Sequence, residues 1–125
     1  MPEGTQKLIL IADDNQEVIE YYEKWLHEDG FVTISATTLQ QLDEVFDASF
    51  DKIDAVVLDG CIPGDELNTL GFIERALTNG FTQPIIAASS VADYRKMMVK
   101  AGCSAESEKK EVPDVIWDLF NLASA

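Results

Sequence analysis

The sequence predicts an α/β protein in which helices cover both faces of a parallel sheet, and three observations support this class. Short apolar runs bounded by turn residues are typical of strands buried on both faces of a sheet. Segments with apolar residues every three or four positions, typical of amphipathic helices, alternate with these runs. The 125 residues, of which 46% are hydrophobic and 26% charged, suit a single globular domain over residues 1–125.

The first two strand–helix units occupy the N-terminal part of the chain. Strands are expected at residues 7–12 and 31–36, where most side chains are apolar. Asp14 or Asn15 can cap the first helix, and Gly30 is expected to end it. The second helix shows a capping-box pair and then an apolar face, formed by Thr38 and Gln41 and by Leu42, Val45 and Phe46.

The third unit contains residues 55–58, a continuous apolar run that leads directly into Asp59. The chain is expected to turn at Gly60, Pro63 and Gly64, because glycine and proline favour turns. Before Asn79 and Gly80, a helix is expected from the apolar residues at helical spacing, which are Leu67, Leu70, Ile73 and Leu77.

The fourth and fifth units complete the alternation. A strand at residues 84–88 precedes Ser89 and Ser90, and Ser90 can cap the next helix. That helix contains Val91, Tyr94, Met97, Met98 and Ala101 at helical spacing, with Gly102 behind them. Residues 103–108 are polar, and a short strand is expected there only because the alternation requires one. The last helix opens around Pro113 and has an apolar face formed by Val115, Ile116, Leu119, Phe120 and Leu122.

The composition argues against several classes of function. A net charge of −14 opposes nonspecific binding to nucleic acid, whose phosphates it would repel, and favours cations. No run approaches the roughly 18 apolar residues of a membrane span, and the first residues lack a signal-peptide pattern, so we expect a cytoplasmic protein. Cys61 and Cys103 lack metal-ligand spacing and are expected to be reduced, and His27 is the only histidine.

Polar side chains follow four of the expected strands. Asp13 and Asp14 follow the first, Asp59 the third, Ser89 the fourth and Lys109 the fifth. Because parallel strands bring their carboxyl ends to one edge of a sheet, these groups are expected to meet there. Three carboxylates at one edge repel each other unless a cation joins them, and Mg²⁺ prefers such oxygen ligands. A carboxylate beside Mg²⁺ can act as the nucleophile of phosphoryl transfer.

Each of these signals is weak alone, because Asp and Ser at strand ends often cap helices and a single Lys is usually solvated. Their joint placement is specific. It resembles the receiver domains of two-component response regulators over essentially the whole chain. The resemblance depends on residues 10–14, residues 57–59 with 63–64, residues 84–90, and Gly102 seven positions before Lys109.

The resemblance implies a role for each of these groups. Asp59 matches the phosphoacceptor. Asp13 and Asp14 match the acidic pair that holds Mg²⁺, with Asp14 the more direct ligand and Asp13 partly acting through water. The backbone carbonyl of Cys61 matches a further protein ligand of the metal, which Asp59 also contacts.

The resemblance further implies that the Ser89 hydroxyl and the Lys109 ammonium bind the phosphoryl group. It implies a doubly wound (βα)5, flavodoxin-like three-layer sandwich with the strand order 2-1-3-4-5. Such a domain takes its phosphoryl group from a sensor histidine kinase or a histidine phosphotransfer domain, and it is not an enzyme toward other substrates. Its helix 4, strand 5 and helix 5 would present a changed face to a protein partner, around Ser90, Asp93, Lys100, Glu106 and Val115.

The chain departs from the family pattern near its fifth strand. Glu106 stands three positions before the lysine, where the family commonly has an aromatic residue that swings inward. Lys110 follows Lys109, where the family usually has a proline, and Pro113 comes later. Lys110 is therefore an alternative candidate for the phosphate-binding lysine.

Two other functions stay open. A receiver-like interaction module that works without phosphorylation is suggested by Glu106 and the polar fifth strand. An aspartate-nucleophile phosphatase also uses carboxylates and Mg²⁺, but Cys61 stands where such enzymes usually have a second Asp, and 125 residues leave no substrate cap. The chain is either a stand-alone domain acting through protein contacts, which its start at Met1 favours, or a piece of something larger.

Overall fold

A computed structural model describes residues 6–121 and shows five strands and five α-helices. The strands are β1 (Leu8–Ala12), β2 (Val32–Ala36), β3 (Ala55–Leu58), β4 (Ile85–Ala87) and β5 (Ala105–Glu106). The helices are α1 (Gln16–Glu28), α2 (Leu39–Ser49), α3 (Leu70–Thr78), α4 (Ala92–Ala101) and α5 (Val112–Asn121), and a 3₁₀ turn covers Lys109–Glu111.

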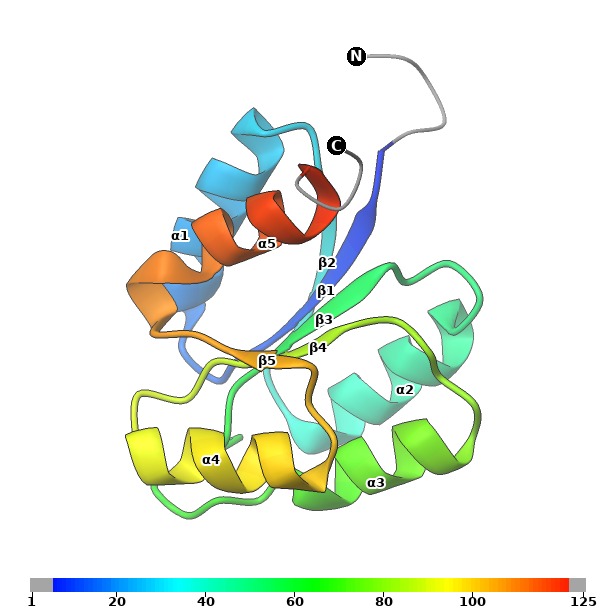
Figure 1. Ribbon diagram of the computed structural model, residues 1–125, viewed down its shortest axis with the longest axis vertical. Helices are drawn as coiled ribbons and strands as arrows, with labels where there is room; N and C mark the ends of the chain where they lie inside the picture. Colours follow the sequence, from blue (N-terminus) through cyan, green and yellow to red (C-terminus); the bar gives the residue numbers. More distant parts are fainter. Residues whose placement is uncertain (1–5, 122–125) are drawn as a thin grey trace.

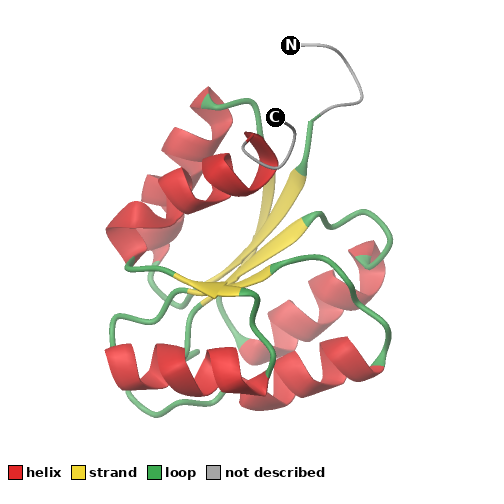
Figure 2. Cartoon of the chain, viewed as in Figure 1, coloured by secondary structure: helices red, strands yellow, loops and turns green. Residues whose placement is uncertain are grey.

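The strands form one parallel sheet in the order β2-β1-β3-β4-β5. Helices α1 and α5 cover one face of the sheet, and α2, α3 and α4 cover the other (Figure 1, Figure 2). The predicted α/β class, the three layers and the strand order 2-1-3-4-5 are therefore confirmed. All carboxyl ends of the strands point to one edge of the sheet, where the candidate site residues were expected.

The central strands are buried on both faces because their side chains alternate between two apolar cores. In β1, Ile9 and Ile11 pack with residues of α1 and α5, whereas Leu10 and Ala12 pack with residues of α2 and α3. Every residue of β3 is buried. This two-sided burial explains why these strands are continuous apolar runs in the sequence.

The starts of α1 and α2 follow the predicted caps. The Asn15 side chain accepts a hydrogen bond from the Glu17 backbone N–H at 2.9 Å, so Asn15 rather than Asp14 caps α1. The Thr38 hydroxyl accepts a hydrogen bond from the Gln41 N–H at 3.1 Å, as the capping-box spacing predicted. These caps supply acceptors for backbone N–H groups that have no partner within the helix.

The structure corrects three details of the later helices. Leu67 lies in the loop before α3 rather than in the helix. Ser90 does not cap α4, because Val91 occupies the cap position and its side chain makes no capping hydrogen bond. Among the described residues of α4 only Met98 is buried, and the Met97 side chain is exposed. The expectation for Leu122 falls outside the described residues.

No helix among residues 6–121 is both long and apolar enough to cross a lipid bilayer. The longest, α1, has 13 residues, and several of its exposed positions are charged. Cys61 and Cys103 are buried and carry free thiols.

Candidate functional site

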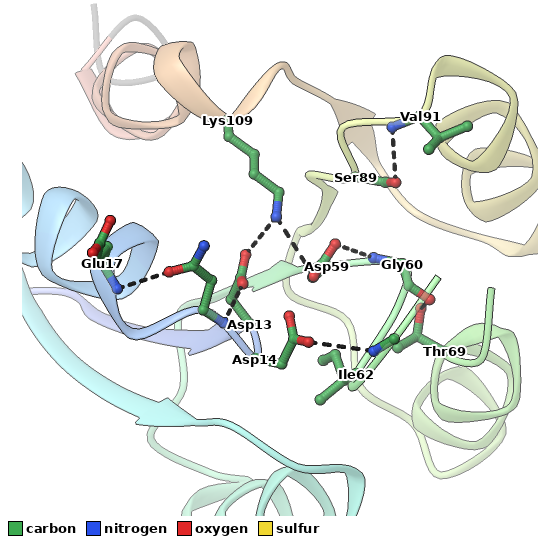
Figure 3. A network of polar contacts seen from close by, with 12 residues as sticks. Asp13, Asp14, Glu17, Asp59, Gly60, Ile62, Thr69, Ser89, Val91 and Lys109 are labelled. Carbon is green, nitrogen blue, oxygen red and sulfur yellow. Dashed lines mark hydrogen bonds and ion pairs between the residues drawn. The ribbon is translucent and has the colours of Figure 1, made fainter. Parts of the chain in front are cut away.

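Asp59 is held rigidly at the carboxyl end of β3, beside a cavity of about 220 Å³. Its backbone N–H donates to the Ala12 carbonyl at 2.9 Å, which continues the pairing of β1 and β3 beyond Leu58. Its Oδ1 accepts a hydrogen bond from the Gly60 N–H at 2.8 Å. The residue is only 6% exposed. The carboxylate is thus fixed in orientation, with Oδ1 toward the backbone and Oδ2 toward Lys109 (Figure 3).

The end of β1 supplies two further carboxylates. Asp13 is buried, and its Oδ1 accepts a hydrogen bond from the Asn15 N–H at 2.9 Å. Asp14 is exposed, and its Oδ2 accepts from the Gly64 N–H at 3.3 Å. Carboxylate oxygens of Asp13, Asp14 and Asp59 all lie within 4.8 Å of one another. This donor set fits Mg²⁺, which prefers oxygen ligands and is often held by carboxylates.

Lys109 lies against two of these carboxylates (Figure 3). Its Nζ is 2.9 Å from Asp13 Oδ2 and 3.5 Å from Asp59 Oδ2. The Lys110 side chain is 77% exposed and lies 3.9 Å from Glu108. The structure therefore places Lys109, and not its neighbour, at the acidic cluster.

The ammonium of Lys109 stays charged in this position. Burial by itself would lower the pKa of Lys109, but the hydrogen bond to Asp13 and the negative charges of Asp59 and Asp13 outweigh it, so the pKa is raised. Lys109 is consequently a permanent positive charge next to the carboxylate of Asp59.

The carboxylate of Asp59 is harder to ionise than an ordinary aspartate. Burial raises the pKa of Asp59 to about 6, and the nearby negative charge of Asp13 adds to this effect. The charge of Lys109 and the hydrogen bond from Gly60 act in the opposite direction without cancelling the rise. Lys109 therefore does not fully offset burial and the negative charge around Asp59, and an added cation would favour the ionised carboxylate.

Ser89 follows β4 directly and is buried. Its hydroxyl oxygen accepts a hydrogen bond from the Val91 N–H at 3.1 Å, so it faces the start of α4 (Figure 3). Gly60 allows Ser89 to come this close to the loop after β3. A Cβ atom at position 60 would lie 3.2 Å from Ser89 Cβ, and a larger side chain would displace it.

The loop after β3 closes one side of the site. Cys61 lines the cavity and is buried, and this burial, aided by the charge of Asp59, raises the pKa of its thiol. Asn68 makes two hydrogen bonds of 2.9 Å with the backbone of Ile62, one as acceptor and one as donor. The Ile62–Pro63 peptide in this loop is cis. Asn68 thus fixes the loop that carries Cys61.

Comparison with known proteins identifies the architecture. No protein-family model and no curated protein matches the chain. The non-phosphorylated HemR receiver domain from Leptospira biflexa matches with a TM-score of 0.78 and 20% identity, over 93% of this chain and 95% of that one. A response regulator from Thermotoga maritima matches with a TM-score of 0.74 and 20% identity, over 92% and 98%. The chain has the receiver-domain fold.

A third structure with the receiver fold comes from the CheX–CheY–BeF₃–Mg²⁺ complex of Borrelia burgdorferi. The match has a TM-score of 0.76 and 16% identity, over 91% of this chain and 89% of that one. The resemblance to receiver domains that the strand-end residues indicated is therefore confirmed at the level of the fold.

Two residues of this receiver fold were not indicated by the sequence patterns. Asn68 fixes the loop after β3, as described above. Arg95 donates hydrogen bonds from Nη1 to the Ser89 carbonyl at 2.8 Å and from Nε to Glu106 Oε1 at 3.1 Å. Each of them hydrogen-bonds to backbone atoms elsewhere in the chain, and such contacts leave no spacing or motif in the sequence.

Proposed function

We propose that the chain is the phosphoacceptor domain of a two-component phosphorelay, in which Asp59 takes a phosphoryl group from a phosphohistidine. The observation that carries the proposal is the joint environment of Asp59. Oxygens of Asp13 and Asp14 lie within 4.8 Å of its carboxylate, and Lys109 Nζ lies 3.5 Å from its Oδ2. A nucleophile, ligands for a cation and a fixed positive charge therefore occupy one cavity. The shared fold with receiver domains supports this reading.

In the proposed reaction, a carboxylate oxygen of Asp59 attacks phosphorus and forms an O–P bond. The N–P bond of the phosphohistidine breaks, and its electron pair returns to the imidazole ring. Lys109 would pair with one phosphoryl oxygen. The Ser89 hydroxyl would donate to another after leaving the Val91 N–H.

Magnesium is the proposed cofactor, and when bound it would offset the charge of the incoming phosphoryl group. Its protein ligands would be Asp13, Asp14, Asp59 and the backbone carbonyl of Cys61. The clustered carboxylates, of which Asp13 and Asp59 are buried, support this assignment, since a cation between them would favour their ionised forms.

The proposed donors are a sensor histidine kinase or a histidine phosphotransfer domain, acting in the cytoplasm. The chain would catalyse only its own phosphorylation and dephosphorylation, and it would not bind nucleic acid directly. A protein partner would read the phosphorylated state on the face of α4, β5 and α5. The residues proposed for this face are Ser90, Asp93, Lys100, Glu106 and Val115.

The proposal is tested by incubating the protein with acetyl phosphate and Mg²⁺ and measuring its intact mass. We expect the mass of one phosphoryl group to be added to the wild type and nothing to be added to Asp59→Asn. Asp51→Asn, at an exposed turn that precedes β3, whereas Asp59 follows that strand, is the matched control and should be phosphorylated normally. An unmodified wild type, or modification of Asp59→Asn, would contradict the proposal.

One observation favours the alternative of a receiver-like module that works without phosphorylation. The Glu106 side chain is paired with Arg95 and does not fill the inward-swinging role of an aromatic residue. Under this alternative, beryllofluoride with Mg²⁺ would leave the NMR spectrum of α4 and β5 unchanged. Steady release of phosphate from an aryl phosphate ester would instead indicate a phosphatase.

A further inference from the structure

We propose that Arg95 is a positioning residue for Ser89, and that Glu106 in turn positions Arg95. The inference rests on the proposed phosphorylation of Asp59, because it concerns the hydroxyl that would bind the phosphoryl group. It assigns a task to Glu106, one of the residues at which the chain departs from the usual receiver pattern.

Arg95 is held tightly for a residue on a surface helix. Its side chain is only 13% exposed, although most of α4 faces solvent. Two different nitrogens of its guanidinium donate hydrogen bonds, one to the Ser89 carbonyl and one to the Glu106 carboxylate. The planar guanidinium presents its donors in a fixed fork, so one side chain sets the distance between these two acceptors. Charge-assisted hydrogen bonds of this kind are stronger than neutral ones.

The Ser89 backbone is therefore fixed from two sides. Arg95 holds its carbonyl at 2.8 Å, and Gly60 lets its Cβ pack against the loop that follows Asp59. With the backbone fixed, the hydroxyl can exchange its present contact with the Val91 N–H for the cavity by rotation about the Cα–Cβ bond alone. Arg95 thus makes the hydroxyl available without requiring a rearrangement of the loop.

Glu106 connects Arg95 to the segment that carries Lys109. It pairs with Ala87 in the register of β4 and β5, and β5 is only two residues long. Three positions later, Lys109 reaches Asp13 and Asp59. The ion pair between Arg95 and Glu106 therefore joins the two segments that would each bind an oxygen of the phosphoryl group.

The experiment compares Arg95→Met with the wild type by two measurements. The first is hydrogen exchange at the Val91 amide, which donates to the Ser89 hydroxyl and so reports the position of Ser89 without any phosphodonor. The second is the rate of phosphorylation by acetyl phosphate with Mg²⁺. We expect exchange about tenfold faster and phosphorylation about tenfold slower, as the loss of the charge-assisted hydrogen bond to the Ser89 carbonyl would give.

Further variants separate positioning from general damage to the fold. Arg95→Lys should restore part of the rate, because an ammonium supplies charge and one donor but not the fork. Exchanging the charges in Arg95→Glu/Glu106→Arg restores an ion pair but leaves the Ser89 carbonyl without its donor, so the defect should persist. Arg75→Met is the matched control, since Arg75 pairs with Asp43 between α2 and α3, and it should behave as wild type.

The outcomes distinguish this inference from the proposed function. If the wild type takes no phosphoryl group, the proposed function fails, and amide exchange at Val91 alone decides whether Arg95 holds Ser89. If Arg95→Met is folded and its Val91 amide exchanges as in the wild type, the inference is wrong. It is equally wrong if the wild type and Arg95→Met are phosphorylated at the same rate, or if the charge exchange restores the rate.

Discussion

Strand β3 is buried at every residue and lies between two paired neighbours, whereas β5 has two residues, one half-buried and one exposed, at the edge of the sheet. Helix α4, next to β5, buries only Met98 among its described residues. The helices over β1 and β3 each bury two or three side chains. The same sheet thus has a densely packed centre and a loosely packed edge.

The candidate site is divided between these two regions. Asp13 and Asp59 extend from the packed centre, and Ser89 and Lys109 come from segments that adjoin α4 and β5. Regions with few buried apolar contacts open and rearrange more easily than packed cores. The difference indicates that Asp13 and Asp59 sit on the most firmly packed part of the sheet, whereas Ser89 and Lys109 adjoin its more loosely packed edge.

The largest effect on stability is expected from a substitution that disrupts the packed centre. Leu58→Ala removes a fully buried side chain directly before Asp59 and leaves a cavity in the core. We expect it to lower the free energy of unfolding by about 2–5 kcal/mol. Urea unfolding followed by circular dichroism measures this change, and a loss below about 1 kcal/mol would show that the centre is less rigid than described.

A smaller effect on stability is expected from removing the negative charge of Asp59 at the end of the packed centre. Because the pKa of Asp59 rises from 3.8 to about 6 on folding, its contribution to stability is complete below pH 3.8 and is lost as the pH rises through about 6. Asp59→Asn lacks this loss. Without Mg²⁺, the variant should gain about 1–3 kcal/mol over the wild type between about pH 4 and pH 7.

Urea titrations of both proteins across that pH range provide the measurement. Asp51→Asn, whose side chain is exposed, should show no such pH-dependent gain. A stability difference between Asp59→Asn and the wild type that does not change with pH would contradict the raised pKa of Asp59.

The smallest effect on stability is expected from a substitution in α4, at the loosely packed edge of the sheet. Met97 is 48% exposed on α4, so Met97→Ala removes little buried area and replaces Met with a good helix former. We expect the free energy of unfolding to change by at most about 0.5 kcal/mol. A loss comparable to that of Leu58→Ala would mean that α4 is packed as firmly as the centre.

The sequence predicted the packed centre better than the edge, for physical reasons. The runs at residues 8–12 and 55–58 are apolar because both faces of these strands are buried, so they stand out in the sequence. On α4, helical spacing shows which residues share a face but not whether another element covers it. Met97 was therefore expected to belong with Met98, yet it lies at the surface.

The candidate site shows the same limit. Residues at strand ends were found because the order of strands and helices places them at one edge. Arg95 and Asn68 were not found, because each hydrogen-bonds to backbone atoms, which almost any residue type could supply. The choice between Lys109 and Lys110 also required the structure, since adjacent residues are distinguished only by the direction in which each side chain leaves the chain.

The cavity beside Asp59 has a consequence for selectivity. Its volume of about 220 Å³ leaves space for a phosphoryl group and a few water molecules. Inside it, a phosphohistidine and a small acyl phosphate present the same reacting group. Under the proposed function, discrimination between cognate and foreign donors would therefore depend on the surface that surrounds the opening of the cavity.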